Sequence, residues 1–432
     1  MLKFWNRLFL DERPSIGLSF FRIFAALTTG FHVLPLLFRL EDNFLSNAFR
    51  EANTSFFTIE FLKLVYKSPD SLVVFFAALF CLSWFAFLIG LRSQISCIVM
   101  TACCYYFYAL NSYFIGTLSW DILLVTLFLM CITPYHGDYF SVDSLFDCCS
   151  DPYKRLRPYF LQRLLQMQIA STFFYTALYK TTGEGNWITG NPLYYLMNMP
   201  ASGVMKHFML KEWLAMHPTL CYVIGISIVV TEFLLGFLLF IPRTRISAVY
   251  AGIFFHIVLI LTMDVPAIFF FLFPAQLTLF INPQDIVRWI EHRRVYHAAA
   301  SRLKLIYDGH CGFCRASVRQ LKVMDLFNKV EYVDFQAHPD LSELHPQLNK
   351  KTATSRIHLI EPPYLLGEEK KLYAGFFVFR RLSFVMPMLW PMVLVLYAPG
   401  SGLIGPLVYQ WVADHRYLFH LNKTCRENAC YR

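Results

Sequence analysis

Eight long apolar runs dominate the first 282 residues and limit what the chain can fold into. They lie at 17–38, 72–90, 94–113, 118–134, 158–180, 219–241, 247–262 and 266–282. A helix needs roughly 17–25 mostly apolar residues to cross the hydrocarbon core of a bilayer. Charged residues make up only 16% of the 432 residues, whereas an average soluble domain has about 25%. The sequence therefore predicts a polytopic α-helical membrane bundle of about eight spans over residues 1–282.

The last third of the chain is more polar than the rest. Residues 302–432 are predicted to form a separate α/β domain, after a charged and helical linker at 283–301. An apolar, β-prone run at 303–307 meets the turn signal Asp308-Gly309. Cys311 and Cys314 then open a segment with helical spacing of apolar residues. The predicted order is strand, turn, dithiol and helix.

The Cys311-x-x-Cys314 pair predicts thiol–disulfide chemistry, because a helix N-terminus stabilises whichever sulfur is ionised. Cys311 is nearer to the turn, so we expect it to be the more exposed sulfur and the attacking thiolate. Cys314, one helical turn later, is expected to be the resolving thiol. Arg315 and His310 add positive charge beside the pair, and Asp308 is predicted to handle the second proton.

Two structural alternatives for the pair stay open. One is half of a zinc site, which Cys425 and Cys430 near the C-terminus would complete. The other is a pair of inert core cysteines. The strand-to-helix context favours redox chemistry without a metal. The cysteines inside the apolar runs are predicted to be small packing residues; they are Cys81, Cys97, Cys103, Cys104, Cys131 and Cys221.

The motif Tyr307-Asp308-Gly309-x-Cys311-x-x-Cys314 resembles the signature of the DCC family of thiol-disulfide oxidoreductases, small domains related to thioredoxin. Downstream segments agree with it: Tyr373-Ala374-Gly375-Phe376, Leu389-Trp390-Pro391, Pro399-Gly400, and Val408-Tyr409 through Arg416-Tyr417. The resemblance covers about residues 302–420 and implies a thioredoxin-like α/β fold. It also implies that the apolar run 384–397 belongs to the helices of this domain and not to another span.

Lys and Arg in the loops predict the orientation in the membrane, since cytosolic loops carry an excess of both. With the N-terminus inside, the inner segments hold most of these cations, and the short outer loops at 114–117 and 263–265 hold none. Both termini and the dithiol domain are thus predicted to be cytosolic, in a plasma or inner membrane if the source is bacterial. A cytosolic dithiol rests reduced.

Ionisable residues inside apolar helices are costly and therefore mark candidate sites. Glu232 lies mid-helix, and His256 of the next span is its predicted partner. Asp121 and Lys180 lie near the outer ends of their helices. Lys180 has two interpretations: a cation that ends a helix favourably, or a desolvated amine that accepts a proton from a quinol.

The segment from Gln166-Met167-Gln168 through Lys180, Trp187 and Tyr194-Tyr195 resembles the HTTM domain, the membrane fold shared with vitamin K-dependent γ-glutamyl carboxylases. This resemblance covers about residues 15–282. It implies that Lys180 occupies the position of the lysine that deprotonates reduced vitamin K. Asn111 stands where those carboxylases have a histidine before a Ser-Tyr pair, and the dithiol domain replaces their large extramembrane domain.

The leading functional prediction is a membrane-tethered thiol-disulfide oxidoreductase, a protein-disulfide reductase. Its predicted partners are the lipid bilayer, a disulfide-containing protein or small thiol, and a vitamin K-like quinone in the bundle. A first alternative is a carboxylase-like enzyme with Lys180 as base, whose dithiol recycles the cofactor. A second is a lipid-binding or transport-like protein that senses redox state. The net charge of +9 is modest and no stretch resembles a basic nucleic-acid-binding arm, so no nucleic-acid partner is predicted.

Overall fold

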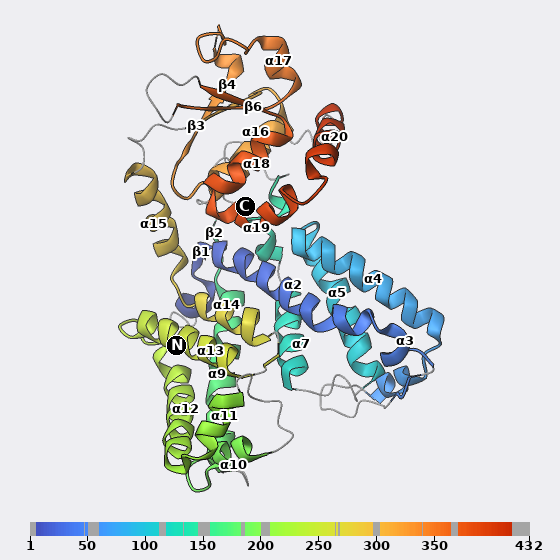
Figure 1. Ribbon diagram of the computed structural model, residues 1–432, viewed down its shortest axis with the longest axis vertical. Coiled ribbons are helices and arrows are strands. Elements are labelled where there is room, and N and C mark those ends of the chain that lie inside the picture. Colours follow the sequence, from blue (N-terminus) through green and yellow to red (C-terminus); the bar gives the residue numbers. More distant parts are fainter. Residues whose placement is uncertain are drawn as a thin grey trace. The chain divides into compact units, whose positions relative to one another are not determined.

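The computed structural model (Figure 1) describes residues 6–46, 48–50, 60–111, 118–132, 134–145, 156–182, 186–199, 208–263, 265–266, 268–296, 303–338, 340–363 and 370–416. The chain forms two compact units. The first comprises Met1–Ser141 and Arg157–Pro283, and the second comprises Val142–Leu156 and Gln284–Arg432.

The first unit is almost entirely helical. Its elements are η1 (Asn6–Leu10), α2 (Ile16–Leu37), α3 (Leu40–Asn43), η2 (Glu60–Lys67), α4 (Asp70–Ile89), α5 (Ser93–Leu110), α7 (Leu118–Met130), η3 (Pro134–Gly137), α9 (Phe160–Thr182), α10 (Pro192–Asn198), α11 (Phe208–Ala215), α12 (Pro218–Leu238), α13 (Arg245–Thr262), η5 (Ile268–Leu272) and α14 (Phe273–Thr278). Two three-residue strands, β1 (Glu12–Pro14) and β2 (Leu156–Pro158), pair with each other.

Five helices of the described residues are long and apolar enough to cross a membrane: α2, α4, α5, α12 and α13. Two further predicted spans correspond to shorter apolar helices, at Ser119–Met130 and Ile268–Thr278. The remaining one corresponds to α9, which is long but carries buried polar side chains such as Gln162 and Gln166. The chain is therefore a mostly helical membrane protein with at least these five candidate spans.

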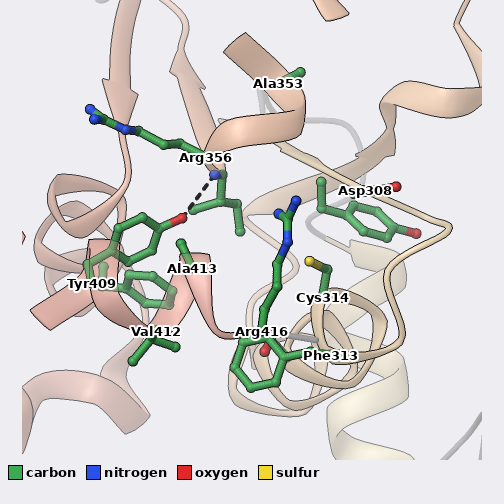
Figure 2. Close-up of a pocket in the computed structure, with 13 residues that line it drawn as sticks. Asp308, Phe313, Cys314, Ala353, Arg356, Tyr409, Val412, Ala413 and Arg416 are labelled. Carbon is green, nitrogen blue, oxygen red and sulfur yellow. Dashed lines mark hydrogen bonds between the residues drawn. The ribbon is translucent and has the colours of Figure 1, made fainter. Parts of the chain in front are cut away.

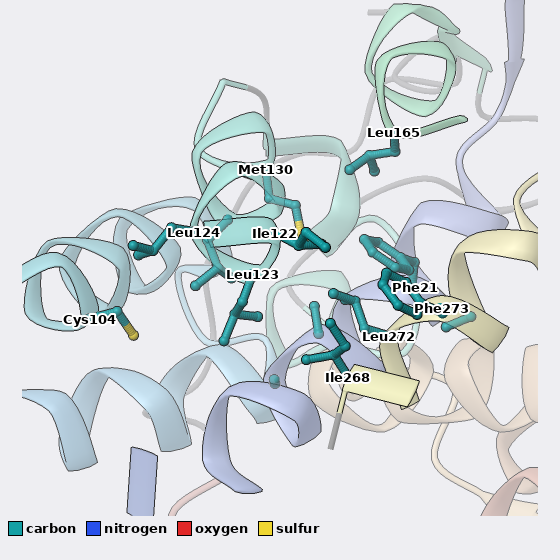
Figure 3. Packing of buried hydrophobic residues seen from close by; sticks show 14 of the residues in the cluster. Phe21, Cys104, Ile122, Leu123, Leu124, Met130, Leu165, Ile268, Leu272 and Phe273 are labelled. Carbon is teal, nitrogen blue, oxygen red and sulfur yellow. The ribbon is translucent and has the colours of Figure 1, made fainter. Parts of the chain in front are cut away.

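The core of the first unit is built from apolar side chains of helices that are distant in sequence (Figure 3). Phe21 of α2, Leu123 of α7, Leu165 of α9 and Leu272 of η5 are all fully buried. Because lipid is as apolar as these side chains, their close packing, rather than exclusion of water, holds such helices together.

The second unit contains a four-stranded sheet. Its elements are α8 (Val142–Leu145), α15 (Pro283–Tyr296), β3 (Leu303–Tyr307), α16 (Gly312–Met324), β4 (Val330–Asp334), η7 (Phe335–Ala337), α17 (Lys350–Ser355), β5 (His358–Glu361), β6 (Lys371–Ala374), α18 (Phe376–Val385), η8 (Pro387–Leu389), α19 (Trp390–Leu396) and α20 (Ser401–Asp414). The strand order is β4-β3-β5-β6, with β3 parallel to β4 and the other two pairs antiparallel.

Each face of this sheet has its own apolar cluster, because successive side chains of a strand point to opposite faces. Leu305 of β3 packs with Val318 of α16 and Leu382 of α18. Ile306, the next residue of β3, packs on the other face with Ala353 of α17. The sheet is thus covered on both sides, by α16 and α18 on one and by α17 on the other (Figure 1).

The short helix α8 belongs to the second unit although it lies in the chain between α7 and α9. It packs against α16, and Nε2 of the buried Gln320 donates a hydrogen bond to the Ser144 carbonyl at 3.2 Å. The sequence-based division at residue 282 assigns this segment to the membrane domain. One helical turn has too little periodicity to reveal such a partner.

Candidate active site

The carboxylate of Asp334 shapes the turn between β3 and α16. Asp334 is the last residue of the neighbouring strand β4. The Gly309 amide donates to Oδ1 of Asp334 at 2.9 Å, and the same oxygen accepts from the Gln336 amide at 3.0 Å. A β-carbon on Gly309 would lie 1.8 Å from Oδ2 of Asp334. Glycine is therefore required here by the close approach of this fixed side chain.

We expect Gly309→Ala to destabilise the second unit by about 1–3 kcal/mol, because the added methyl group displaces the Asp334 carboxylate. Thermal unfolding of the purified full-length protein measures the effect. Gly402→Ala is the matched control, since a β-carbon there would meet only an arginine nitrogen, at 3.7 Å. Equal melting temperatures for the two variants would contradict this view of the turn.

Cys311 occupies the N-cap position of α16, where its backbone is extended and the helix has not yet begun. Its Sγ accepts the Cys314 backbone N–H at 3.2 Å. The first amides of a helix lack partners within the helix, and the positive pole of the helix dipole lies there. A thiolate at this position satisfies one of these amides and is stabilised by the pole.

The two cysteines have opposite electrostatic properties. The pKa of Cys311 is lowered from 9.0 to about 6, mainly by hydrogen bonding from the Cys314 side chain, with further contributions from the Cys314 amide and the charge of Arg416. The pKa of Cys314 is raised, because its proton is shared with Cys311 and because the group is buried. At neutral pH the pair therefore contains one thiolate, on Cys311, and one thiol.

The expectation that Cys311 is the more exposed sulfur is wrong. Cys311 is only 3% exposed, whereas Cys314 is partly exposed. The reason is the cap itself, because a sulfur that accepts the Cys314 amide is folded back over the first turn of the helix.

Arg416, just after α20, is a cation near the dithiol that the sequence does not predict. Arg416 lowers the pKa of both cysteines. Its Nη2 donates to the Thr354 carbonyl at 2.9 Å, and Figure 2 shows its side chain beside Cys314. The sequence gives no spacing signal for such a contact, since α20 follows the dithiol by the whole length of the domain.

Arg416→Gln should raise the pKa of Cys311 above about 6, because a cation that favours the thiolate is removed. Alkylation of Cys311 by iodoacetamide is then slower near pH 6, and the rates of variant and parent converge at alkaline pH. Peptide mass spectrometry of the full-length protein gives the rate at each pH. Arg315→Gln is the control and should leave the profile unchanged. Identical profiles for Arg416→Gln and the parent would refute this role.

A cavity of about 70 Å³ lies beside Cys314 (Figure 2). Its walls include Phe313, Tyr409 and Val412, and Arg356 and Arg416 add two cations. Tyr409 is held in place by its hydroxyl oxygen, which accepts the Ile357 N–H at 3.1 Å. The cavity has about the size of one aliphatic side chain and is mostly apolar.

Asp308 lines the same cavity as Cys314. The carboxylate is buried, and its Oδ1 accepts the His310 amide at 3.0 Å and the Gln336 side-chain amide at 3.1 Å. Two hydrogen bonds fix its orientation. Asp308 thus lies beside the cavity that Cys314 lines, and its role as proton acceptor stays a prediction.

In the first unit the partner of Glu232 is Lys180, and the prediction of His256 is wrong. Nζ of Lys180 lies 2.6 Å from each Glu232 oxygen and 5.3 Å from the centre of the Trp187 ring. α9 and α12 pack along each other and bring these side chains together. His256 instead contacts the Gly252 carbonyl at 2.7 Å and is surrounded by phenylalanine rings.

Asn111 and Asp121, two further residues of the bundle that the sequence singles out, have structural partners. Asn111 ends α5 and donates from Nδ2 to the carbonyls of Asn43 and Phe49, at 3.0 and 2.8 Å. Asp121 accepts a hydrogen bond from the Tyr108 hydroxyl. Both side chains therefore tie helices and loops of the bundle together.

Within the described ranges, no group of three or more His, Cys, Asp and Glu side chains is arranged to hold a metal ion. Cys425 and Cys430, the other half of the zinc alternative, lie outside the described residues. In the part of the chain that the structure describes, the dithiol is thus a two-cysteine site.

The fold and this site define a helical membrane protein that carries a small dithiol domain. Residues 12–284 match the model of the HTTM domain, and the chain belongs to that family. Residues 305–421 match the model of the DCC1-like thiol-disulfide oxidoreductase. Both resemblances are thereby confirmed, as is their fusion in one chain. No curated protein and no solved structure matches the chain.

Proposed function

We propose that the protein is a membrane-tethered thiol-disulfide oxidoreductase that reduces disulfides at Cys311 and Cys314. The observation that carries the proposal is the position of Cys311 at the N-cap of α16, where its pKa falls to about 6 beside a protonated Cys314. A thiolate is the nucleophile of disulfide exchange. This geometry thus supplies an attacking sulfur and a resolving sulfur together.

The reaction proceeds in two exchanges. The Cys311 thiolate attacks one sulfur of the substrate disulfide, that S–S bond breaks, and a mixed disulfide forms while the first substrate thiolate leaves and takes a proton. Cys314 then loses its proton and attacks Sγ of Cys311, which releases the second substrate thiol. The substrate gains two electrons and the pair becomes a disulfide. Asp308 accepts the Cys314 proton and passes it to the second substrate thiolate, and the proton on the first substrate thiol comes from water.

The sheet supports a thioredoxin-like fold for this domain. Its order β4-β3-β5-β6 combines one parallel pair with two antiparallel pairs, and the dithiol begins the helix that follows the first strand. The strand–turn–helix arrangement around Cys-x-x-Cys is the redox context expected of such domains.

The cavity beside Cys314 supports a substrate that carries an apolar group next to its disulfide. A volume of about 70 Å³ fits one aliphatic side chain, and Arg356 and Arg416 can bind a neighbouring carboxylate. We therefore favour a protein or peptide disulfide.

The proposed topology has eight spans with both termini and the dithiol in the cytosol. Its support is the excess of Lys and Arg in the alternate loops that this topology puts inside. On the cytosolic side of the membrane, the expected role of the dithiol is to reduce disulfides.

We propose a membrane-soluble quinone as the electron partner. Lys180, the base that the carboxylase resemblance implies, does not fit the deprotonation of a reduced quinone. Lys180 is bound by both oxygens of Glu232. An ammonium group held by a carboxylate has no lone pair with which to accept a proton. The ion pair argues against the carboxylase-like alternative and in favour of a structural Lys180.

The test uses pre-reduced full-length protein in lipid nanodiscs under anaerobic conditions. Peptide disulfides, with and without an aliphatic neighbour to the cysteine, are added, and alkylation with mass spectrometry counts oxidised Cys311 and Cys314. We expect stoichiometric oxidation of the pair with release of substrate thiols, fastest for the aliphatic peptide. A pair that stays reduced with every disulfide refutes the proposal. A parallel sample with a quinone and the Lys180→Ala variant tests the electron partner separately.

A further inference from the structure

Two cysteines of the first unit, which we call the membrane unit from here on, lie in contact, although the sequence predicts both to be packing residues. Cys97 is in the second turn of α5, and Cys131 directly follows α7. Their sulfurs are 3.7 Å apart. A disulfide bond is about 2.05 Å long, so rotation of one or both side chains with a small shift of the helix ends brings the sulfurs to bonding distance. The pairing is possible because α5 and α7 pack against each other.

The surroundings distinguish the two sulfurs. Cys97 is fully buried, and Cys131 is partly exposed. The Cys131 thiol donates to the Thr101 hydroxyl oxygen at 3.4 Å, and that hydroxyl donates to the Cys97 carbonyl at 2.7 Å. A hydroxyl beside Cys131 can rotate and donate to a thiolate there. An external disulfide can therefore reach Cys131, and Cys97 lies in contact with it and can attack a mixed disulfide formed there.

We propose that Cys97 and Cys131 form a second redox-active pair, in the membrane unit, whose substrate class is disulfides that dissolve in or reach the bilayer surface. Neither sulfur belongs to the site at Cys311 and Cys314. The pair is a site of its own, and it works whether or not the proposed function of the C-terminal domain is correct.

The chemistry balances as a thiol–disulfide exchange. The Cys131 thiolate attacks a sulfur of the external disulfide, which breaks and releases one thiol after protonation. The mixed disulfide on Cys131 is then attacked by Cys97, which loses its proton and releases the second thiol. The pair loses two electrons and two protons, and the external disulfide becomes two thiols. The product is a covalent link between the start of α5 and the end of α7.

The test uses the full-length protein with Cys311→Ser and Cys314→Ser, so that the first dithiol does not contribute. The membrane-permeant disulfide 4,4′-dithiodipyridine is the probe. Acid quenching, alkylation under denaturing conditions and peptide mapping follow. We expect the loss of two alkylatable thiols, two thiopyridone molecules released for each pair, no retained adduct, and a cross-linked peptide that joins Cys97 to Cys131.

Two matched variants sharpen the result. With Cys97→Ser added, one thiopyridone is released at this site and the probe stays on Cys131 as an adduct. With Cys81→Ser added, which removes an exposed cysteine elsewhere, the cross-link is unchanged. The same peptide map of the parent protein shows whether the substitutions disturbed the fold. An adduct retained on Cys131 with Cys97 present, or two sulfurs that stay alkylatable in the parent, would overturn the proposal.

Discussion

Cys311→Ser should abolish disulfide exchange at the C-terminal dithiol, with a loss of several orders of magnitude, as removal of a covalent nucleophile causes in other enzymes. A serine hydroxyl is not ionised near neutral pH, whereas the pKa of Cys311 is about 6. The measurement is the rate at which a peptide disulfide is reduced by the pre-reduced full-length protein. The melting temperature of the variant should match that of the parent, because the hydroxyl oxygen also accepts the Cys314 amide at the N-cap.

Cys314→Ser is the informative control for this prediction. The first exchange then proceeds but the second does not, so a mixed disulfide accumulates on Cys311 and is detected as a mass increase. If the adduct instead forms on Cys314 in Cys311→Ser, the roles are exchanged. That outcome is a specific alternative, because Cys314 lines the cavity and Cys311 is only 3% exposed.

Glu232→Gln should destabilise the membrane unit by about 3–5 kcal/mol, because it leaves the charge of Lys180 without its carboxylate between α9 and α12. The side chains of Lys180 and Glu232 are 21% and 9% exposed, so water compensates poorly for the lost partner. Thermal unfolding in a fixed detergent measures the loss. Disulfide exchange at Cys311 should be unaffected.

The double variant Lys180→Met with Glu232→Gln is the matched control. Removing both charges should restore most of the stability, since no uncompensated charge is then left between α9 and α12. A double variant as unstable as Glu232→Gln would show that the two effects are independent and that the ion pair does not carry the stability.

The sequence was sufficient for features that depend on neighbouring residues. The order strand, turn, dithiol and helix is visible in residues 303–324, because an apolar β-prone run, Asp-Gly and Cys-x-x-Cys each act locally. The apolar runs identified the membrane bundle for the same reason. The two family resemblances rest on such local motifs, and both were confirmed.

Features that depend on which helices meet were beyond the sequence. Glu232 was assigned to His256 because they lie on consecutive helices, but the partner on α9 lies much earlier in the chain. Arg416 lies near the dithiol only in the folded domain, because α20 brings the end of the described chain back toward it. The exposure of Cys311 was misjudged because an N-cap side chain turns inward to reach its amide. A helical period identifies an apolar face and says nothing about which helix covers it.

The short helix α8 makes the C-terminal unit discontinuous in sequence. The chain contributes Val142–Leu156 to it, returns to the first unit for the helices from α9 to α14, and only then supplies the sheet. A fragment that begins at residue 302 would therefore lack the Ser144 carbonyl, which accepts a hydrogen bond from Gln320. The N-terminal fragment would keep α8 without the helix α16 against which it packs. A domain exchange at this site must therefore transfer α8 along with the sheet, because α8 packs against α16.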